Sequence, residues 1–233
     1  MKGKIAFVDS LNNELGQQIF NHIANLYRPM FELAHVCATE DLATADRLLT
    51  WLDSNQIDAL IYSGSLASVN DEHAWIANQI AVTARLLEPQ TRPVPLLGLC
   101  FGHQILAKAA GVPVISHPRP YVGVKALNVV DHSIFGEKSS LHAFVYHQDE
   151  VPSVPPEFSL TLTNDPVRVH GMRHRSKPIF GYQAHPEVPF ATARLFDSSL
   201  NSESYPTQDG DFIMNHFADT VSNFLASKEL DRA

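Results

Sequence analysis

The chain has 233 residues, of which 45% are hydrophobic, and a formal net charge of −8. This length suits one large α/β domain, and its two cysteines are too few for a disulfide framework, which favours a reducing compartment. Lys and Arg are scattered, without the basic stripe of a nucleic-acid-binding protein, and no apolar run is long enough for a signal peptide or a membrane span. The histidines form no HExxH pattern and the chain has no paired CxxC, so we expect no metal site. We expect a soluble, cytoplasmic protein with no nucleic-acid or membrane partner.

The first half of the chain alternates between strand-like and helix-like segments. The strand-like segments are 4–9, 31–39, 57–64 and 95–100. The helix-like segments are 14–26, 42–54, 73–88 and 101–110. In 42–54, for example, Leu48, Leu49 and Leu52 follow Ala45 at positions i+3, i+4 and i+7 of one helix face. Such alternation predicts an α/β, doubly wound fold with a mostly parallel central sheet and helices on both faces.

After Gly111 the sequence becomes rich in strand-like segments separated by Pro and Gly turns, which predicts an extra hairpin region beside the parallel sheet. These segments are 112–116, 122–130, 142–147, 158–163, 167–172 and 178–183. The basic stretch RVHGMRHRSK, 168–177, is interpreted as a solvated hairpin turn, and 189–210 as polar and irregular towards its end. A last amphipathic helix, 211–226, is expected to pack against the sheet. Without repeats or a linker, we expect a single domain, 1–233.

A cysteine stands between two glycines where a strand-like segment meets a helix-like one, in the sequence GLCFG. Gly98 and Gly102, two residues before and two after Cys100, are typical of a nucleophile elbow, whose sharp turn holds a nucleophile above the sheet. The start of the following helix would favour the thiolate, and the Phe101 N–H would face a developing oxyanion. The alternative is a small buried cysteine whose glycines serve helix–strand packing. Cys37 lies in mid-strand and is expected to be a buried, inert thiol.

A possible base for this thiol lies in the sequence GYQAHPEV, after the strand-like segment 178–183. Pro186 favours an extended conformation for His185, and residues i and i+2 of an extended segment project to the same side. His185 and Glu187 can therefore point together, so that the carboxylate fixes the imidazole tautomer and leaves the other nitrogen for Cys100. Taken alone, the same residues could form a surface turn.

Together, GLCFGHQILAKAAG and YQAHPE resemble the nucleophile and His–Glu segments of class I, triad-type glutamine amidotransferases. The resemblance implies a flavodoxin-like fold and a Cys100–His185–Glu187 triad. It also implies hydrolysis of the glutamine side-chain amide through a glutamyl thioester on Cys100, with no metal or organic cofactor.

The same resemblance implies substrate contacts. Gln104 matches a family glutamine that contacts the substrate, although it could equally be a helix-surface amide. VYHQDEV resembles the strand whose backbone holds the α-amino and α-carboxylate groups, which places Tyr146 and His147 at that contact.

Two stretches depart from the family pattern. SGSLASV stands where many members have Gly-Gly-Pro, and Gly64 or Ser65 could still supply the second oxyanion N–H. In PRPYVG, Tyr121 stands where many relatives have an acid before the glycine, so substrate recognition is expected to differ.

The freestanding length resembles that of GMP-synthase-like amidotransferases and of γ-glutamyl peptidases. Three alternatives remain open: a hydrolase of γ-glutamyl amides, an ammonia donor for a separate synthase subunit, and a catalytically silent regulatory protein, against which the intact triad argues. The missing proline in SGSLASV and the polar 189–210 segment favour an open leaving-group side.

Overall fold

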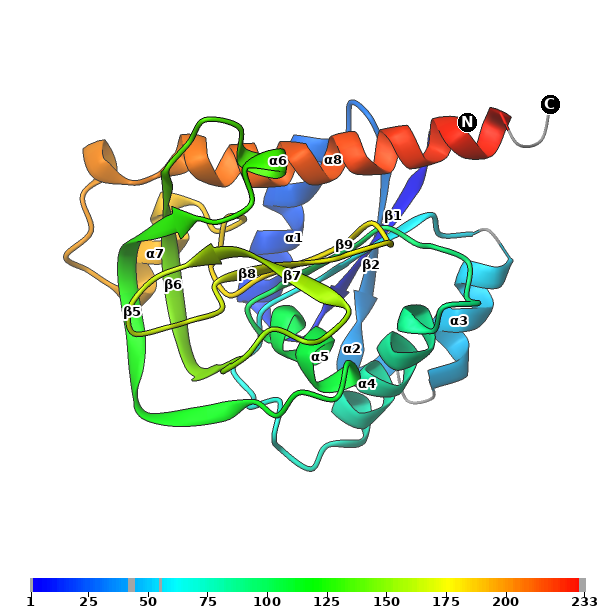
Figure 1. Cartoon of the computed structure of the whole chain (residues 1–233), viewed down its shortest axis with the longest axis horizontal. Coiled ribbons are helices and arrows are strands. Elements are labelled where there is room, and N and C mark those ends of the chain that lie inside the picture. Colours follow the sequence, from blue (N-terminus) through cyan, green and yellow to red (C-terminus); the bar gives the residue numbers. More distant parts are fainter. Residues whose placement is uncertain (1, 42–44, 55, 231–233) are drawn as a thin grey trace.

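The computed structural model describes residues 2–41, 45–54 and 56–230, and its strands form a single sheet (Figure 1). The strands are β1 (Lys4–Asp9), β2 (Glu32–Cys37), β3 (Ala59–Tyr62), β4 (Leu96–Leu99), β5 (Ile115–Val129), β6 (Ser140–Glu150), β7 (Phe158–Thr163), β8 (Gly171–His174) and β9 (Ile179–Tyr182). The helices are α1 (Glu14–Tyr27), α2 (Ala38–Asp41), α3 (Ala45–Asp53), α4 (Ala74–Leu87), α5 (Phe101–Ala109), α6 (His132–Phe135), α7 (Phe190–Phe196) and α8 (Thr207–Leu230), with a 3₁₀ turn at Ser202–Ser204.

The sheet has the order β2-β1-β3-β4-β9-β8-β7-β5-β6. The five strands from β2 to β9 in this order run parallel, and β8, β7, β5 and β6 continue the sheet with antiparallel pairings. This confirms the predicted α/β fold with a mostly parallel centre and an added hairpin region. No helix in the described ranges is both long and apolar enough to cross a membrane.

Two apolar layers cover the two faces of the sheet. Successive residues of a strand point to opposite faces, so Phe7 of β1 packs with α1 and α8, whereas Val8 packs with α3, α4 and α5. Figure 1 shows α8 along one side of the sheet and α3, α4 and α5 on the other. The parallel strands are therefore buried from both sides, which leaves their carboxyl ends as the edge where polar side chains gather.

Several local predictions are wrong. The stretch 168–177 is not a solvated turn, because it contains β8 and buries Val169, His170 and Met172 in the sheet. Cys37 is the last residue of β2 and is half-buried, rather than a buried residue in mid-strand.

Other boundaries also shift. Residues 38–41 form the short helix α2 instead of continuing the strand, and α8 begins at Thr207, earlier than expected. The polar segment 189–210 contains α7. The first residues of the helix predicted for 42–54, namely 42–44, lie outside the described residues.

Candidate active site

The turn between β4 and α5 has the strained geometry that the glycine spacing predicts. Cys100 has φ 49° and ψ −97°, in a region that residues with a side chain rarely adopt. A Cβ on Gly98 would lie 2.6 Å from the carbonyl oxygen of Gly102, and one on Gly102 would lie 2.6 Å from the Cβ of Tyr62. Both glycines are therefore required for the close approach of α5 to β3 and β4.

His185 and Glu187 come together beside Cys100. The Nδ1 atom of His185 lies 2.9 Å from Oε1 of Glu187, whose side chain is 1% exposed. The imidazole lies beside Cys100, since a Cβ on Gly64 would be 2.9 Å from Cε1 of His185 and 3.8 Å from Cβ of Cys100. Donation from Nδ1 to the carboxylate leaves Nε2 as the ring nitrogen available to the thiol. The pair meets through a turn closed by the Val188 N–H on the His185 carbonyl (3.3 Å), not through the extended segment that the sequence suggested.

The electrostatics of this cluster favour a charged imidazole. Burial alone would lower the pKa of His185, but the neighbouring charges of Cys100 and Glu187, together with hydrogen bonds to both, raise it well above 6.5. A nearby imidazolium stabilises the thiolate of a cysteine, which is the nucleophilic form.

The sulfur of Cys100 has two further contacts. The Nε2 of Gln183 donates to it at 3.5 Å, and the Tyr146 carbonyl lies 3.7 Å away. Gln183 is fully buried and was not singled out from the sequence, although it opens the QAHPE stretch beside His185. An amide donor at the sulfur suits a thiolate better than a thiol.

A cavity of about 300 Å³ opens in front of Cys100. Six of the residues expected at the site line it: Ser65, Cys100, Phe101, Gln104, Tyr146 and His147. Gly64 lies next to both His185 and Cys100, since a Cβ on Gly64 would be 2.9 Å from Cε1 of His185 and 3.8 Å from Cβ of Cys100. The structure thus brings all nine residues expected at the site, triad and substrate contacts alike, into one region.

Gln104 and His147 are both buried. The Nε2 of Gln104 donates to the Asp149 carbonyl at 2.9 Å and approaches the side-chain oxygen of Gln183 at 3.3 Å, so Gln104 is not the surface amide of the alternative interpretation. His147 donates through Nδ1 to the same carbonyl at 3.0 Å. Burial lowers the pKa of His147 to about 4, so this ring is neutral near pH 7 and adds no positive charge beside His185. Tyr121 packs edge-on against His147, with ring centroids 5.7 Å apart, and does not itself line the cavity.

Asp149 is the site residue that sequence reasoning missed. It lies within the quoted VYHQDEV segment, lines the cavity, and accepts hydrogen bonds from the hydroxyl groups of Ser68 and Ser116. Among the described residues that line this cavity there is no Lys or Arg, so the Asp149 carboxylate makes it electronegative. Such a site favours a ligand group that carries a positive charge.

A small cavity lies on another side of His185. It is bounded by Gly64, His185 and Glu187, has a volume of about 40 Å³, and has mostly apolar walls that include Leu11, Leu15, Phe144 and Phe196. It has room for ammonia or a water molecule but not for an amino acid. A second cavity of about 90 Å³ also borders His185, together with Pro186 and Tyr205, so the expectation of an open leaving-group side stays a prediction.

Within the described part of the chain, no group of three or more His, Cys, Asp or Glu side chains is arranged to hold a metal ion. The side chains of the site offer a sulfur that can act as a nucleophile, a base beside it, and an acid that orients the base.

Comparisons with known proteins agree with this arrangement. The family model described as Glutamine amidotransferase class-I matches residues 16–198. The A subunit of the glutamine-hydrolysing GMP synthase from Methanopyrus kandleri is 38% identical over 108 residues, which are 45% of this chain and only 58% of that protein. Its counterpart of the same name from Sulfurisphaera tokodaii is 33% identical over 133 residues, 56% of this chain and 68% of that protein.

A solved structure extends the likeness to the fold of almost the whole chain. The crystal structure of a glutamine amidotransferase from Thermotoga maritima superposes with a TM-score of 0.74 at 14% identity, covering 95% of this chain and 99% of that one. Together with the family match over most of the sequence, this leads to one conclusion: the chain belongs to the class I glutamine amidotransferase family.

Proposed function

We propose that this protein hydrolyses the side-chain amide of glutamine to glutamate and ammonia through a thioester on Cys100. The observation that carries the proposal is the contact of Cys100 with His185, itself held by Glu187, at the floor of a cavity the size of one amino acid. A silent binding protein would have no need of the strained turn at Cys100, which costs stability and gains nothing unless the sulfur reacts.

In the proposed first step, the Cys100 sulfur bonds to the carbonyl carbon (Cδ) of the glutamine side-chain amide. The carbonyl electrons move onto oxygen, where backbone N–H groups of Phe101 and of Gly64 or Ser65 stabilise the negative charge. The C–N bond then breaks, and the nitrogen takes the proton of the His185 imidazolium and leaves as ammonia.

In the second step, His185 removes a proton from water, whose oxygen attacks the thioester carbonyl. The C–S bond breaks, glutamate forms, and the sulfur returns to a thiolate beside the imidazolium. Glu187 stabilises the positive charge of His185 in both steps and keeps Nδ1 as the protonated nitrogen.

Recognition of the amino-acid end falls to the far side of the cavity. The Asp149 carboxylate would pair with the α-ammonium group, and its bonds from Ser68 and Ser116 hold it in one orientation. The α-carboxylate would be bound by neutral donors, since no cationic side chain lines the cavity in the described part of the chain.

The leaving group must lie next to His185, because that imidazole delivers its proton. The cavity that His185 shares with Gly64 and Glu187 is about 40 Å³ and largely apolar, which suits ammonia better than the amino acid released from a γ-glutamyl peptide. We therefore favour glutamine over larger γ-glutamyl amides as the substrate. Since the named relatives are components of glutamine-hydrolysing GMP synthases, we also propose that the ammonia passes to a separate acceptor subunit.

The proposal is tested with a panel of substrates. Pure protein is incubated with glutamine, γ-glutamylglycine and glutathione, and ammonia or the free amine is measured, with Cys100→Ala as the control. We expect ammonia from glutamine and no product from the two larger amides. Cleavage of the larger amides in preference to glutamine would contradict the proposal, as would full activity in Cys100→Ala.

A further inference from the structure

The loop after β3 departs from the family pattern at Ser65 and Leu66, where many members have Gly and Pro. A proline stiffens a loop by fixing φ, and its loss should leave the second oxyanion donor poorly held. The hydrogen bonds around this loop show instead that it is tied down on both sides by serine hydroxyls.

The first tie comes from Ser63, which is 1% exposed. Its N–H donates to the Val8 carbonyl at 3.1 Å, and its carbonyl accepts from the Gly102 N–H at 3.2 Å, so its backbone joins β1 to the elbow helix α5. Its hydroxyl accepts from the Ser10 N–H at 2.8 Å and donates to the Gly64 carbonyl at 2.7 Å. Every hydrogen-bonding group of Ser63 is thus engaged.

These two carbonyl contacts orient the neighbouring N–H groups. In a trans peptide the C=O and N–H point in opposite directions within one plane. The Ser63 carbonyl faces α5, so the Gly64 N–H points away from the elbow. The Gly64 carbonyl accepts from the Ser63 hydroxyl, so the Ser65 N–H of the same peptide points away from that hydroxyl. Ser65 itself lines the cavity in front of Cys100. Within the described part of the chain, the N–H groups of Ser65 and Phe101 have no hydrogen-bond partner.

The second tie comes from the Ser65 side chain. Its hydroxyl donates to the Ser10 carbonyl at 2.9 Å and accepts from the Ala67 N–H at 3.1 Å. Ser10 therefore holds the loop through both of its backbone groups, by its N–H to Ser63 and by its carbonyl to Ser65.

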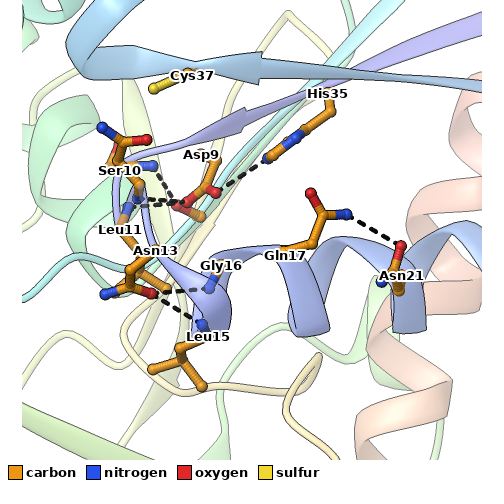
Figure 2. A network of polar contacts seen from close by, with 12 residues as sticks. Asp9, Ser10, Leu11, Asn13, Leu15, Gly16, Gln17, Asn21, His35 and Cys37 are labelled. Carbon is orange, nitrogen blue, oxygen red and sulfur yellow. Dashed lines mark hydrogen bonds and ion pairs between the residues drawn. The ribbon is translucent and has the colours of Figure 1, made fainter.

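The anchor for Ser10 is the turn after β1, shown in Figure 2. The Asp9 carboxylate, 1% exposed, accepts from the Leu11 N–H at 2.8 Å and lies 3.0 Å from Nε2 of His35 (Figure 2). A Cβ on Gly16 would lie 2.2 Å from this carboxylate, so the glycine gives it room beneath the start of α1. Ser10 thus follows a residue whose side chain is held by the turn after β1 and by β2.

We propose that the hydroxyl groups of Ser63 and Ser65 position the loop so that the Ser65 N–H points at the oxyanion. The Ser63 hydroxyl does so by binding the Gly64 carbonyl, and the Ser65 hydroxyl by binding the Ser10 carbonyl. Together they replace the proline that stiffens this loop in many family members. This inference rests on the proposed glutaminase function and deepens it, because it selects Ser65 over Gly64 as the second oxyanion donor. We expect the hydrogen bonds of these two hydroxyl groups to stabilise the transition state and not the binding of substrate, since neither hydroxyl is assigned a contact with the amino-acid end of the substrate.

The test compares Ser65→Ala, which loses the hydroxyl, with Ser65→Thr, which keeps it. Ser222→Ala in α8 is the matched control, because it also removes a serine hydroxyl bonded to a backbone carbonyl (3.0 Å, Ala218) but far along the chain from the site. For each protein, kcat and KM for glutamine, the inhibition constant of glutamate γ-semialdehyde and the melting temperature are measured. The semialdehyde forms a tetrahedral adduct with the thiol and so reports on the oxyanion site.

We expect Ser65→Ala to lower kcat by about 10- to 100-fold and to weaken semialdehyde binding by a similar factor, with KM changed by less than about twofold. Ser65→Thr should lose less of both quantities than Ser65→Ala, and Ser222→Ala should stay close to wild type. The double variant Ser65→Gly/Leu66→Pro, which restores the family residues, should recover most of the activity lost in Ser65→Ala.

Two outcomes separate the two proposals. If wild-type protein hydrolyses glutamine and Ser65→Ala keeps its kcat and its semialdehyde affinity, or changes KM alone, the positioning role is wrong while the function stands. If wild-type protein neither releases ammonia nor binds the semialdehyde, both proposals are wrong.

Discussion

Replacing Gly64 by alanine should displace the catalytic imidazole without touching the thiol. The new Cβ would lie 2.9 Å from Cε1 of His185, whereas ordinary contacts begin near 3.4 Å, so the ring must move by about half an ångström. That ring is hydrogen-bonded to Glu187 at 2.9 Å and lies beside Cys100, so a shift of this size disturbs the hydrogen bond or the approach to the sulfur. Since a misplacement of about 1 Å can cost about 10²-fold in rate, we expect kcat to fall about tenfold, with a loss of stability of about 1 kcal/mol.

The assay is ammonia release from glutamine at saturating substrate, paired with urea unfolding. Gly136→Ala is the control, because Gly136 has φ +60° with open space around it, so an alanine there costs about 1 kcal/mol in backbone strain and leaves the site alone. If Gly64→Ala loses stability like the control but keeps wild-type kcat, then the position of His185 does not limit the reaction and our account of the site is wrong.

Three further predictions concern charge. Glu187→Gln should retain more activity than His185→Ala, and the alkaline limb of its pH–rate profile should move to lower pH, because the lost carboxylate charge no longer raises the pKa of His185; an unmoved limb would contradict this. Asp149→Asn should raise KM for glutamine by about 10- to 100-fold with a smaller effect on kcat, measured by steady-state kinetics, and an unchanged KM would remove Asp149 from substrate binding. The free energy of unfolding should fall as the pH drops below about 6.5, because burial lowers the pKa of His103 and of His170 to about 3 and these side chains then bind protons only in the unfolded chain. Urea titrations at pH 7, 6 and 5 check this, and a rise in stability towards pH 5 would refute it.

The parts of the site that the sequence predicts are those encoded locally. The elbow needs only two glycines around Cys100 and a strand-to-helix transition, and the structure has that turn. The meeting of His185 with Glu187 was predicted correctly for a wrong reason, since a turn rather than an extended segment brings them together.

The parts that the sequence could not predict depend on partners far along the chain. Asp149 is recognisable as a site residue only once Ser68 and Ser116, from two other segments, are seen to bond to it. The loop of Ser65 looked flexible because it lacks a proline, but its stiffness comes from Ser10 at the end of another strand.

The fold, like the site, has parts that the sequence predicts and parts that it does not. The alternation of strands and helices in the first half predicts the parallel sheet well, because each element has its own hydrophobic period. In 168–177 the basic residues hide a strand: Arg173 reaches the Asp131 carboxylate at 2.5 Å while its neighbour Met172 is buried, so this basic residue belongs to β8 and not to a solvated turn.

The identity of the nucleophile is tested most directly by covalent labelling with an electrophilic glutamine analogue, 6-diazo-5-oxo-L-norleucine, followed by peptide mass spectrometry. Cys37 serves as an internal control, because it is half-buried whereas Cys100 is 6% exposed, so simple accessibility would favour Cys37. We predict a single adduct on Cys100, loss of ammonia release in proportion to labelling, and protection by glutamine. Labelling confined to Cys37, or glutamine hydrolysis that persists in Cys100→Ala, would contradict the account.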